Sequence, residues 1–256
     1  MRNSQISHNG SVKTESLLLQ VCGLHYDYPD GTKALQGLDF QLKKDEKLAL
    51  VGANGSGKST LLQHLSGCLS AQRGEILLHG AVVGTDLNRL RRTVGLIFQE
   101  PDDQLFMPSV KEDVAFGLVA HGLPSREAEN EASVMLEKLG VLHLAERPPH
   151  RLSGGEKRMV ALAGILVMEP DIIVLDEPSA ALDPKARRRV IEVLCNLQKP
   201  MILASHDLDM VLDICCRAVI LRSGRAVAEG GAEALFRDEA AMQSYGLELP
   251  LRYQGS

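Results

Sequence analysis

The sequence has no tryptophan, and it lacks any apolar run near the ~20 residues that a membrane-spanning helix needs. The best candidate, ALAGILVM at 161–168, ends at Glu169 and Pro170. Residues 1–16 are polar and do not contain the apolar region of a secretory signal, so we expect a flexible tail there. These absences favour a globular fold.

Cysteine is also scarce. The five thiols are odd in number and irregularly spaced, so neither a disulfide framework nor a zinc site is expected, and we expect buried, reduced thiols. The eight histidines include no pair at metal-ligand spacing. The formal net charge of -5 gives no general attraction to nucleic acid, so no nucleic-acid partner is predicted.

What the sequence does contain is a regular alternation of two kinds of segment. Short apolar runs bounded by turn residues predict strands, and longer stretches with helical periodicity predict helices. The expected strands are 17–24, 35–42, 46–53, 73–80, 91–99, 171–177, 200–205 and a hairpin at 217–230, and the expected helices are 58–67, 109–123, 125–141, 153–168, 185–198 and 207–216. This pattern predicts an α/β core with a helical insertion between about residues 100 and 168.

A phosphate-binding motif lies between a predicted strand and a predicted helix. GANGSGKST at 52–60 fits G-x-x-x-x-G-K-[ST], whose glycines let backbone N–H groups face phosphate oxygens at a helix start. Lys58 adds a charge for the β and γ phosphates, and the Ser59 hydroxyl is suited to ligate Mg²⁺. The predicted nucleotide-binding residues are Gly52, Asn54, Gly55, Ser56, Gly57, Lys58, Ser59 and Thr60. By itself the motif does not separate kinases, GTPases and ATPases.

Two adjacent acids end the predicted strand at 171–177. Ligands of open α/β sheets bind at the carboxyl ends of strands, so Asp176 and Glu177 are expected beside the phosphates. Asp176 would hold Mg²⁺, and Glu177 would be the general base that polarises the attacking water.

The stretch LSGGE at 152–156 narrows the choice among kinases, GTPases and ATPases. Together with the phosphate-binding motif and the acidic strand end, it resembles the ATP-binding subunit of ABC transporters over residues 17–230. The resemblance implies an ATPase with a P-loop NTPase (RecA-like) core, an N-terminal antiparallel β subdomain and an inserted α-helical subdomain. Residues 231–256 would be a C-terminal tail that can help two subunits to dimerise.

The same resemblance implies roles for single residues. Tyr28 matches the aromatic residue that stacks on adenine, in preference to Tyr26, and Gln99 matches a glutamine that reaches Mg²⁺ and the attacking water. Asp183 in SAALD matches an acid that belongs to the nucleotide site, and His206 in SHD matches a histidine that contacts the γ phosphate. The catalytic residues are therefore expected to be Lys58, Gln99, Glu177 and His206, and the Mg²⁺ ligands Ser59, Gln99 and Asp176.

A second anion site is predicted where the helix at 153–168 begins. Ser153, Gly154 and Gly155 would present free N–H groups and the positive end of the helix dipole, with Ser153 as N-cap. In the family, two subunits pair head to tail, and each ATP lies between Lys58 of one subunit and Ser153 of the other. Neither half-site looks degenerate, which is compatible with a homodimer.

QEPDDQLF at 99–106 indicates the class of transporter. With VKEDVAFGL at 110–118, it is similar to the cobalt/nickel and energy-coupling-factor uptake ATPases, whose partners are a transmembrane scaffold and a substrate-binding membrane subunit. Asp102 and Asp103 could form a metal site, a solvated turn or a contact surface. We favour contact with the membrane partner, in which Phe106 adds apolar surface and the aspartates pair with basic residues or position the loop.

The predicted activity is ATP hydrolysis with Mg²⁺ at the cytoplasmic face of the cell membrane, powering the uptake of cobalt or nickel by a peripheral subunit. Vitamin uptake through an energy-coupling-factor scaffold is the alternative, because no residue here touches the cargo. A soluble, non-transport ATPase switch is a further alternative. DNA-repair relatives carry long coiled coils for which this chain is too short.

Overall fold

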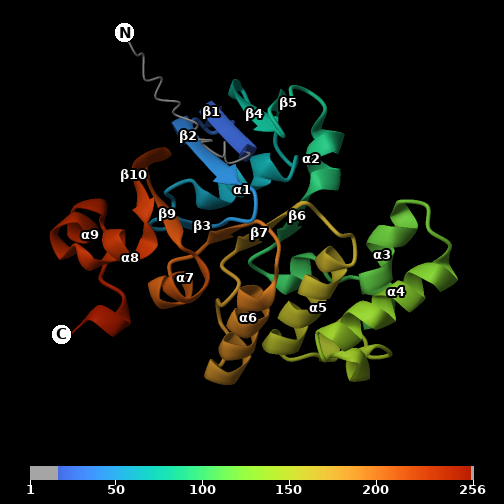
Figure 1. The fold of residues 1–256 in the computed structure, drawn as a ribbon. Helices are drawn as coiled ribbons and strands as arrows, with labels where there is room; N and C mark the ends of the chain where they lie inside the picture. The colour runs from blue at the N-terminus through green and yellow to red at the C-terminus, as the bar shows by residue number, and fades with distance from the viewer. Residues whose placement is uncertain (1–16, 255–256) are drawn as a thin grey trace, which may run out of the picture.

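The computed structural model describes residues 17–254, so the tail predicted at residues 1–16 lies outside the described part of the chain. Two sheets form the centre of the molecule (Figure 1). The smaller sheet has the strand order β2-β1-β4-β5 and is antiparallel, as predicted for the N-terminal subdomain. Its strands are β1 (Leu17–Asp27), β2 (Lys33–Lys43), β4 (Arg73–Leu78) and β5 (Ala81–Val82).

The larger sheet is mostly parallel and has the order β10-β9-β3-β8-β7-β6. The pairs β3–β8, β3–β9, β7–β8 and β6–β7 are parallel, whereas β9 and β10 form the predicted antiparallel hairpin. Its strands are β3 (Lys47–Val51), β6 (Val94–Ile97), β7 (Ile172–Asp176), β8 (Met201–Ala204), β9 (Arg217–Arg222) and β10 (Arg225–Gly231). The α/β core is therefore confirmed.

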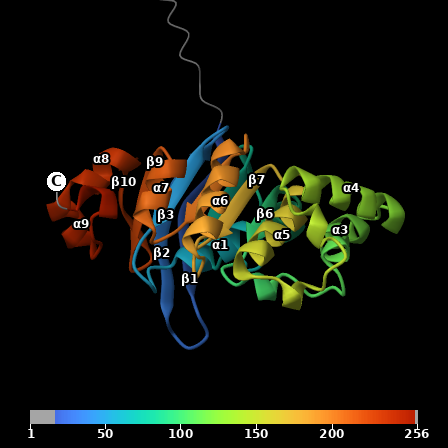
Figure 2. The same cartoon turned by 90° about the horizontal axis from the view of Figure 1, so that it is seen from below.

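The central strands β3, β7 and β8 of the larger sheet are buried on both faces, which explains their uninterrupted apolar sequences, whereas β10 at one edge is mostly exposed. Side chains alternate along a strand: Ile172 and Val174 of β7 enter one hydrophobic core, and Ile173 and Leu175 enter the other. The first core also contains α1 (Lys58–Leu65) and the antiparallel sheet. The second contains α6 (Pro184–Asn196), α7 (Leu208–Ile214) and the inserted helices, which Figure 2 shows at one end of the molecule.

The inserted helical subdomain lies at one end of the molecule (Figure 1). Its helices are α3 (Val110–Ala120), α4 (Ser125–Lys138) and α5 (Gly154–Leu166), with short 3₁₀ turns η1 (Pro101–Asp103), η2 (Leu142–Leu144) and η3 (Pro149–Arg151). Both α3 and α5 begin with a capping box, Ser109 with Glu112 and Ser153 with Glu156. The predicted N-cap role of Ser153 is thus observed in the structure.

Two expectations were wrong. Residues 91–93 belong to helix α2 (Leu87–Thr93) rather than to a strand, because Leu90 is buried and the Arg91 guanidinium donates to the Gly67 carbonyl, 3.0 and 3.2 Å away. The thiols are all free, but they are not generally buried. Cys22, Cys68 and Cys216 are exposed, Cys195 is partly buried, and Cys215 is buried.

The C-terminal residues form structure that the sequence did not reveal. They contain α8 (Ala232–Arg237), α9 (Glu239–Tyr245) and η4 (Leu251–Tyr253), at the opposite end of the molecule from α3 and α4 (Figures 1 and 2). Phe236 and Met242 are fully buried in the second core. Arg252 donates to Asp209 and Asp213 of α7 at 2.8 and 2.7 Å, which attaches the end of the described chain to the domain. Across residues 17–254, no helix has the length and apolar character to span a bilayer.

Candidate functional site

The phosphate-binding loop connects β3 to α1 and borders a cavity of about 290 Å³. Two positions of the loop require glycine because backbone from another segment lies close to them. A Cβ on Gly52 would lie 2.4 Å from the Leu221 carbonyl oxygen. A Cβ on Gly57, whose φ is +105°, would lie 2.6 Å from the Ala34 carbonyl oxygen. The loop can therefore form only with glycine at these two positions.

Lys58 is buried at the first position of α1. Its ammonium donates to the carbonyl oxygens of Gly52 at 2.6 Å and Ala53 at 3.3 Å. Burial lowers the pKa of Lys58, and the nearby charges of Asp176 and Glu177 act in the opposite direction. The loop thus holds a cation beside its own backbone N–H groups, which is the arrangement that a polyphosphate requires.

Asp176 ends β7 in the same cavity, and its side chain fits a cation. Its Oδ1 is buried without a hydrogen-bond partner. Burial raises the pKa of Asp176, whereas a hydrogen bond from the Ser59 side chain lowers it. A carboxylate oxygen with an open lone pair beside a serine hydroxyl is a suitable ligand pair for Mg²⁺.

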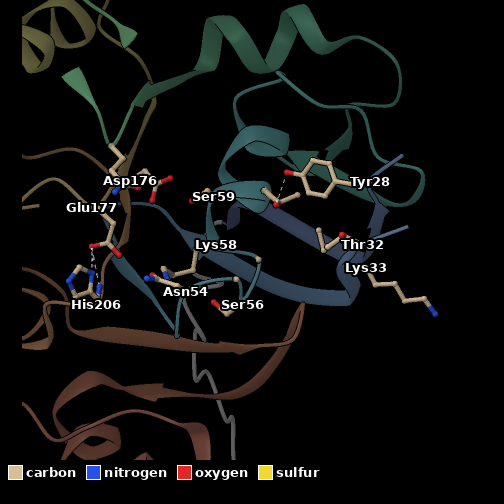
Figure 3. Close-up of a pocket in the computed structure, with 15 residues that line it drawn as sticks. Tyr28, Thr32, Lys33, Asn54, Ser56, Lys58, Ser59, Asp176, Glu177 and His206 are labelled. Atoms are coloured by element: carbon tan, nitrogen blue, oxygen red, sulfur yellow. Dashed lines mark hydrogen bonds and ion pairs between the residues drawn. The ribbon is translucent and has the colours of Figure 1, made fainter. Parts of the chain in front are cut away.

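Glu177 and His206 form a contact at the edge of the cavity (Figure 3). Glu177 Oε2 accepts hydrogen bonds from Ser205 Oγ at 3.1 Å and the His206 backbone N–H at 3.2 Å, and it lies 2.8 Å from His206 Nδ1. Glu177 is 7% exposed and has φ of +44°, whereas the His206 side chain is 68% exposed. Sequence reasoning missed Ser205, although its place directly before His206 was a usable signal.

An aromatic side chain closes the other side of the cavity. The Tyr28 hydroxyl lies 3.0 Å from Thr60 Oγ1, and its ring meets Tyr26 edge to face at 5.1 Å. Tyr28 lines the cavity, while the Tyr26 ring meets His64 edge to face at 4.7 Å. The cavity also includes residues that the sequence did not single out, namely Thr32, Lys33 and Ala34 in the stretch that follows Tyr28.

The cavity brings together most of the predicted nucleotide-site residues. Asn54, Gly55, Ser56 and Gly57 of the loop line it with Lys58, Ser59, Thr60, Gln99, Asp176, Glu177 and His206. These residues come from the loop after β3, the loop after β6, the end of β7 and the loop after β8. Because parallel strands end at one edge of the sheet, segments far apart in the sequence meet here.

The second predicted half-site is separate. Ser153, Gly155 and Asp183 line a hollow of about 230 Å³ that shares no residue with the cavity around Lys58, and Gly154 follows Ser153 at the start of α5. Asp183 accepts hydrogen bonds from the Lys185 and Ala186 backbone N–H groups, so it caps α6. The residues predicted for the two half-sites therefore line two separate hollows of one chain.

The contacts of the loop at 99–106 favour the second of the two roles expected for Asp102, which were pairing with a partner and positioning the loop. Asp102 does not present a free carboxylate to a partner, because Lys157 of α5 donates to both its oxygens at 2.6 and 2.9 Å. Phe106 is 64% exposed and meets Phe116 of α3 edge to face at 4.9 Å. Asp103 is also exposed. The apolar surface predicted near Phe106 is present, whereas Asp102 positions the loop.

Comparison with known proteins identifies the family. The model of the ABC transporter family matches residues 35–180. The chain belongs to this family. It is an ATP-binding protein and an ATP hydrolase with the P-loop NTPase fold of ABC ATPases.

Several relatives match over nearly the whole chain. It is 50% identical over 239 residues to an ABC transporter ATP-binding protein of Geobacter sulfurreducens, covering 93% of this chain and 96% of the relative. It is 43% identical to the energy-coupling factor transporter ATP-binding protein EcfA of Methanothermobacter thermautotrophicus, covering 91% and 77%. The structure of cbiO1 from Clostridium perfringens, part of the ABC transporter complex cbiONQ, has a TM-score of 0.79 and 38% identity and covers 90% and 94%.

Proposed function

We propose that this chain is the ATPase subunit of a membrane importer for cobalt or nickel ions, in which two copies enclose two ATP molecules. The observation that carries the proposal is the distribution of charge in the site. One cavity holds a phosphate-binding lysine, an unpartnered carboxylate oxygen and a carboxylate–histidine contact, while Ser153 lies in a separate hollow. A second copy in head-to-tail orientation would supply the missing half.

The chemistry follows from the residues around the cavity. Lys58 and the loop N–H groups bind the β and γ phosphates, and Tyr28 stacks on the adenine. Ser59, Asp176 and Gln99 would hold Mg²⁺, which supplies charge neutralisation on the phosphate oxygens. Glu177 orients a water molecule and accepts its proton as the water oxygen bonds to the γ phosphorus and the bond to ADP breaks.

His206 has a different role, because its ring is exposed whereas Glu177 is buried. One ring nitrogen contacts the Glu177 carboxylate, and the remainder of the ring faces the cavity, where the γ phosphate would lie. His206 would therefore contact both the γ phosphate and the Glu177 carboxylate, so that binding of the phosphate affects the general base. Loss of that phosphate removes the charge-assisted contacts between the two copies and opens the dimer.

The partner surface lies on the helical subdomain. Phe106 and Phe116 form an exposed aromatic pair, with Val119 also exposed on α3. Such a surface is suited to an apolar helix segment of a membrane subunit, which would keep this chain at the cytoplasmic face of the membrane. The cbiO1 structure supports this assignment, since that protein is part of the ABC transporter complex cbiONQ.

A transport assay tests the identity of the cargo. Cells that co-express the chain with its membrane partners should accumulate labelled cobalt or nickel, and Glu177→Gln should abolish accumulation. Accumulation of a labelled vitamin in place of either metal would reject the metal assignment. It would favour the alternative, an energy-coupling-factor vitamin importer.

A further inference from the structure

A buried arginine on α5 holds the backbone of the loop that carries Gln99. Arg158 is 1% exposed. Its two terminal nitrogens donate to the carbonyl oxygens of Phe98 and Gln99, both at 2.6 Å. Burial lowers the pKa of Arg158, and the charges of Glu100 and Asp176 oppose that shift. The guanidinium thus lies between the Gln99 loop (residues 98–104) and the acidic end of β7.

Two more contacts join α5 to the same loop. Lys157 pairs with Asp102, and the Gln104 side chain donates to the Ala161 carbonyl oxygen at 3.0 Å. Residue 161 lies four positions after 157 and three after 158, so it neighbours both on the surface of α5, and the three residues form one patch. The patch contacts the loop at several points, and the contact made directly to Gln99 is the hydrogen bond from Arg158 to its carbonyl oxygen.

We infer that Arg158 is a positioning residue that directs the Gln99 side chain into the nucleotide cavity. This role rests on the ATP hydrolysis site proposed above. Arg158 does not contact the nucleotide itself in this role, and it acts on the reaction only through Gln99. The planar guanidinium can bond two successive carbonyls in a fixed geometry, which a lysine ammonium cannot reproduce. Arg158 belongs to the helix that Ser153 begins, so the same helix places Gln99 in one site and presents Ser153 to the other.

A purely structural arginine would behave differently. If Arg158 only satisfied buried carbonyls, its replacement would lower stability and affect turnover equally with or without the Gln99 side chain. A positioning residue affects the chemical step, because a displacement of about 1 Å at a reacting centre can cost ~100-fold in rate. The two roles are separated by a double-mutant cycle between Arg158 and Gln99.

The experiment measures ATP turnover by Arg158→Lys, Gln99→Ala and the double variant, together with the melting temperature of each. We expect Arg158→Lys to lower kcat about tenfold with less than a twofold change in KM for ATP. In the Gln99→Ala background the same substitution should change kcat by less than twofold. Equal losses in both backgrounds, a change confined to KM, or an unchanged kcat would each overturn the inference.

Controls separate folding from positioning. Arg217→Lys replaces another largely buried arginine, which donates to the Gln41 carbonyl and to Glu46 at the end of the sheet away from the cavity, and it should leave kcat within twofold. If Arg158→Lys does not fold, Asp102→Asn weakens the exposed Lys157 contact instead, because it removes the negative charge of that pair. Asp102→Asn should lower kcat two- to threefold when Gln99 is present and leave kcat unchanged in the Gln99→Ala background. Equal losses of kcat in the two backgrounds would reject the inference. Absent turnover in the unmodified chain would instead reject the proposed function.

Discussion

The Glu156→Gln substitution should strengthen ATP-driven dimerisation. Glu156 Oε2 accepts hydrogen bonds from both the Ser153 backbone N–H and Ser153 Oγ at 2.8 Å. Hydrogen bonds from Ser153 hold the pKa of Glu156 below its usual range, so the side chain is ionised at neutral pH. A carboxylate therefore occupies the helix start at which the partner's γ phosphate would dock. Glutamine keeps the acceptor oxygen and removes the charge.

The expected change in dimer affinity follows from the distance between the Glu156 carboxylate and the docked phosphate. A phosphate oxygen hydrogen-bonded to Ser153 Oγ at about 2.7 Å lies at most about 5.5 Å from Glu156 Oε2. Two unit charges at that separation repel by about 0.8 kcal/mol in a water-like dielectric, and by more in a closed interface. Because each dimer contains two such sites, the dissociation constant of the ATP-bound dimer should fall roughly tenfold, at about 1.4 kcal/mol per tenfold.

The assay measures the monomer–dimer equilibrium in saturating ATP, by light scattering, in a Glu177→Gln background that does not hydrolyse the nucleotide. The matched control is Glu112→Gln, because Glu112 forms the same capping box with Ser109 at the start of α3, outside both hollows. Both substitutions remove a charge from a helix start and should cost about 0.3–1 kcal/mol of stability. Only Glu156→Gln should tighten the dimer.

An unchanged or weaker dimer for Glu156→Gln would refute this reasoning. It would mean that the carboxylate moves away without cost when ATP arrives, or that the phosphate does not reach Ser153. Equal tightening by Glu112→Gln would show that the effect comes from net charge rather than from the half-site.

Three further outcomes are expected. Lys58→Ala should weaken ATP binding at least tenfold in a fluorescent-analogue titration, because it removes the cation of the phosphate loop; unchanged binding and turnover would reject that loop as the site. Phe106→Asp should reduce co-purification with the membrane subunits while nucleotide binding stays within twofold, and retained co-purification would place the contact elsewhere. Burial raises the pKa of Asp207, but hydrogen bonds led by that from Arg187 outweigh it and hold the pKa below its ordinary value. Arg187→Gln should therefore lower the melting temperature at pH 7, and the gap from the unmodified chain should narrow as the pH falls below about 4; a constant gap would mean that this pair does not stabilise the fold.

Much of the fold could be predicted because its signals are local. The central strands of the larger sheet, such as β3, β7 and β8, are buried along most of their length, so each is an unbroken apolar run, and glycine marks places where the chain must turn. The phosphate motif predicts a strand, a loop and a helix together, and those elements are present. The two S-x-x-E capping boxes likewise indicate the starts of α3 and α5.

The contacts that could not be predicted are those between distant residues. Arg158 pairs with carbonyls 59 and 60 positions away, and Lys157 pairs with Asp102 across 55 positions. Nothing in the local pattern identifies the partner of a backbone carbonyl. Helices α8 and α9 have six and seven residues, too short for a periodic signal, and the burial of Phe236 depends on packing against the rest of the domain.

The central claim is that each ATP is completed by Lys58 of one copy and Ser153 of the other. Mixing two inactive variants tests it most directly. Lys58→Ala disables the phosphate loop, and Ser153→Asp keeps a good N-cap but repels the γ phosphate. In a mixed dimer both defects fall in one site and leave the other intact, so an equimolar mixture should hydrolyse ATP at up to about a quarter of the unmodified rate, while each variant alone is inactive. A mixture as inactive as its components would contradict the shared site.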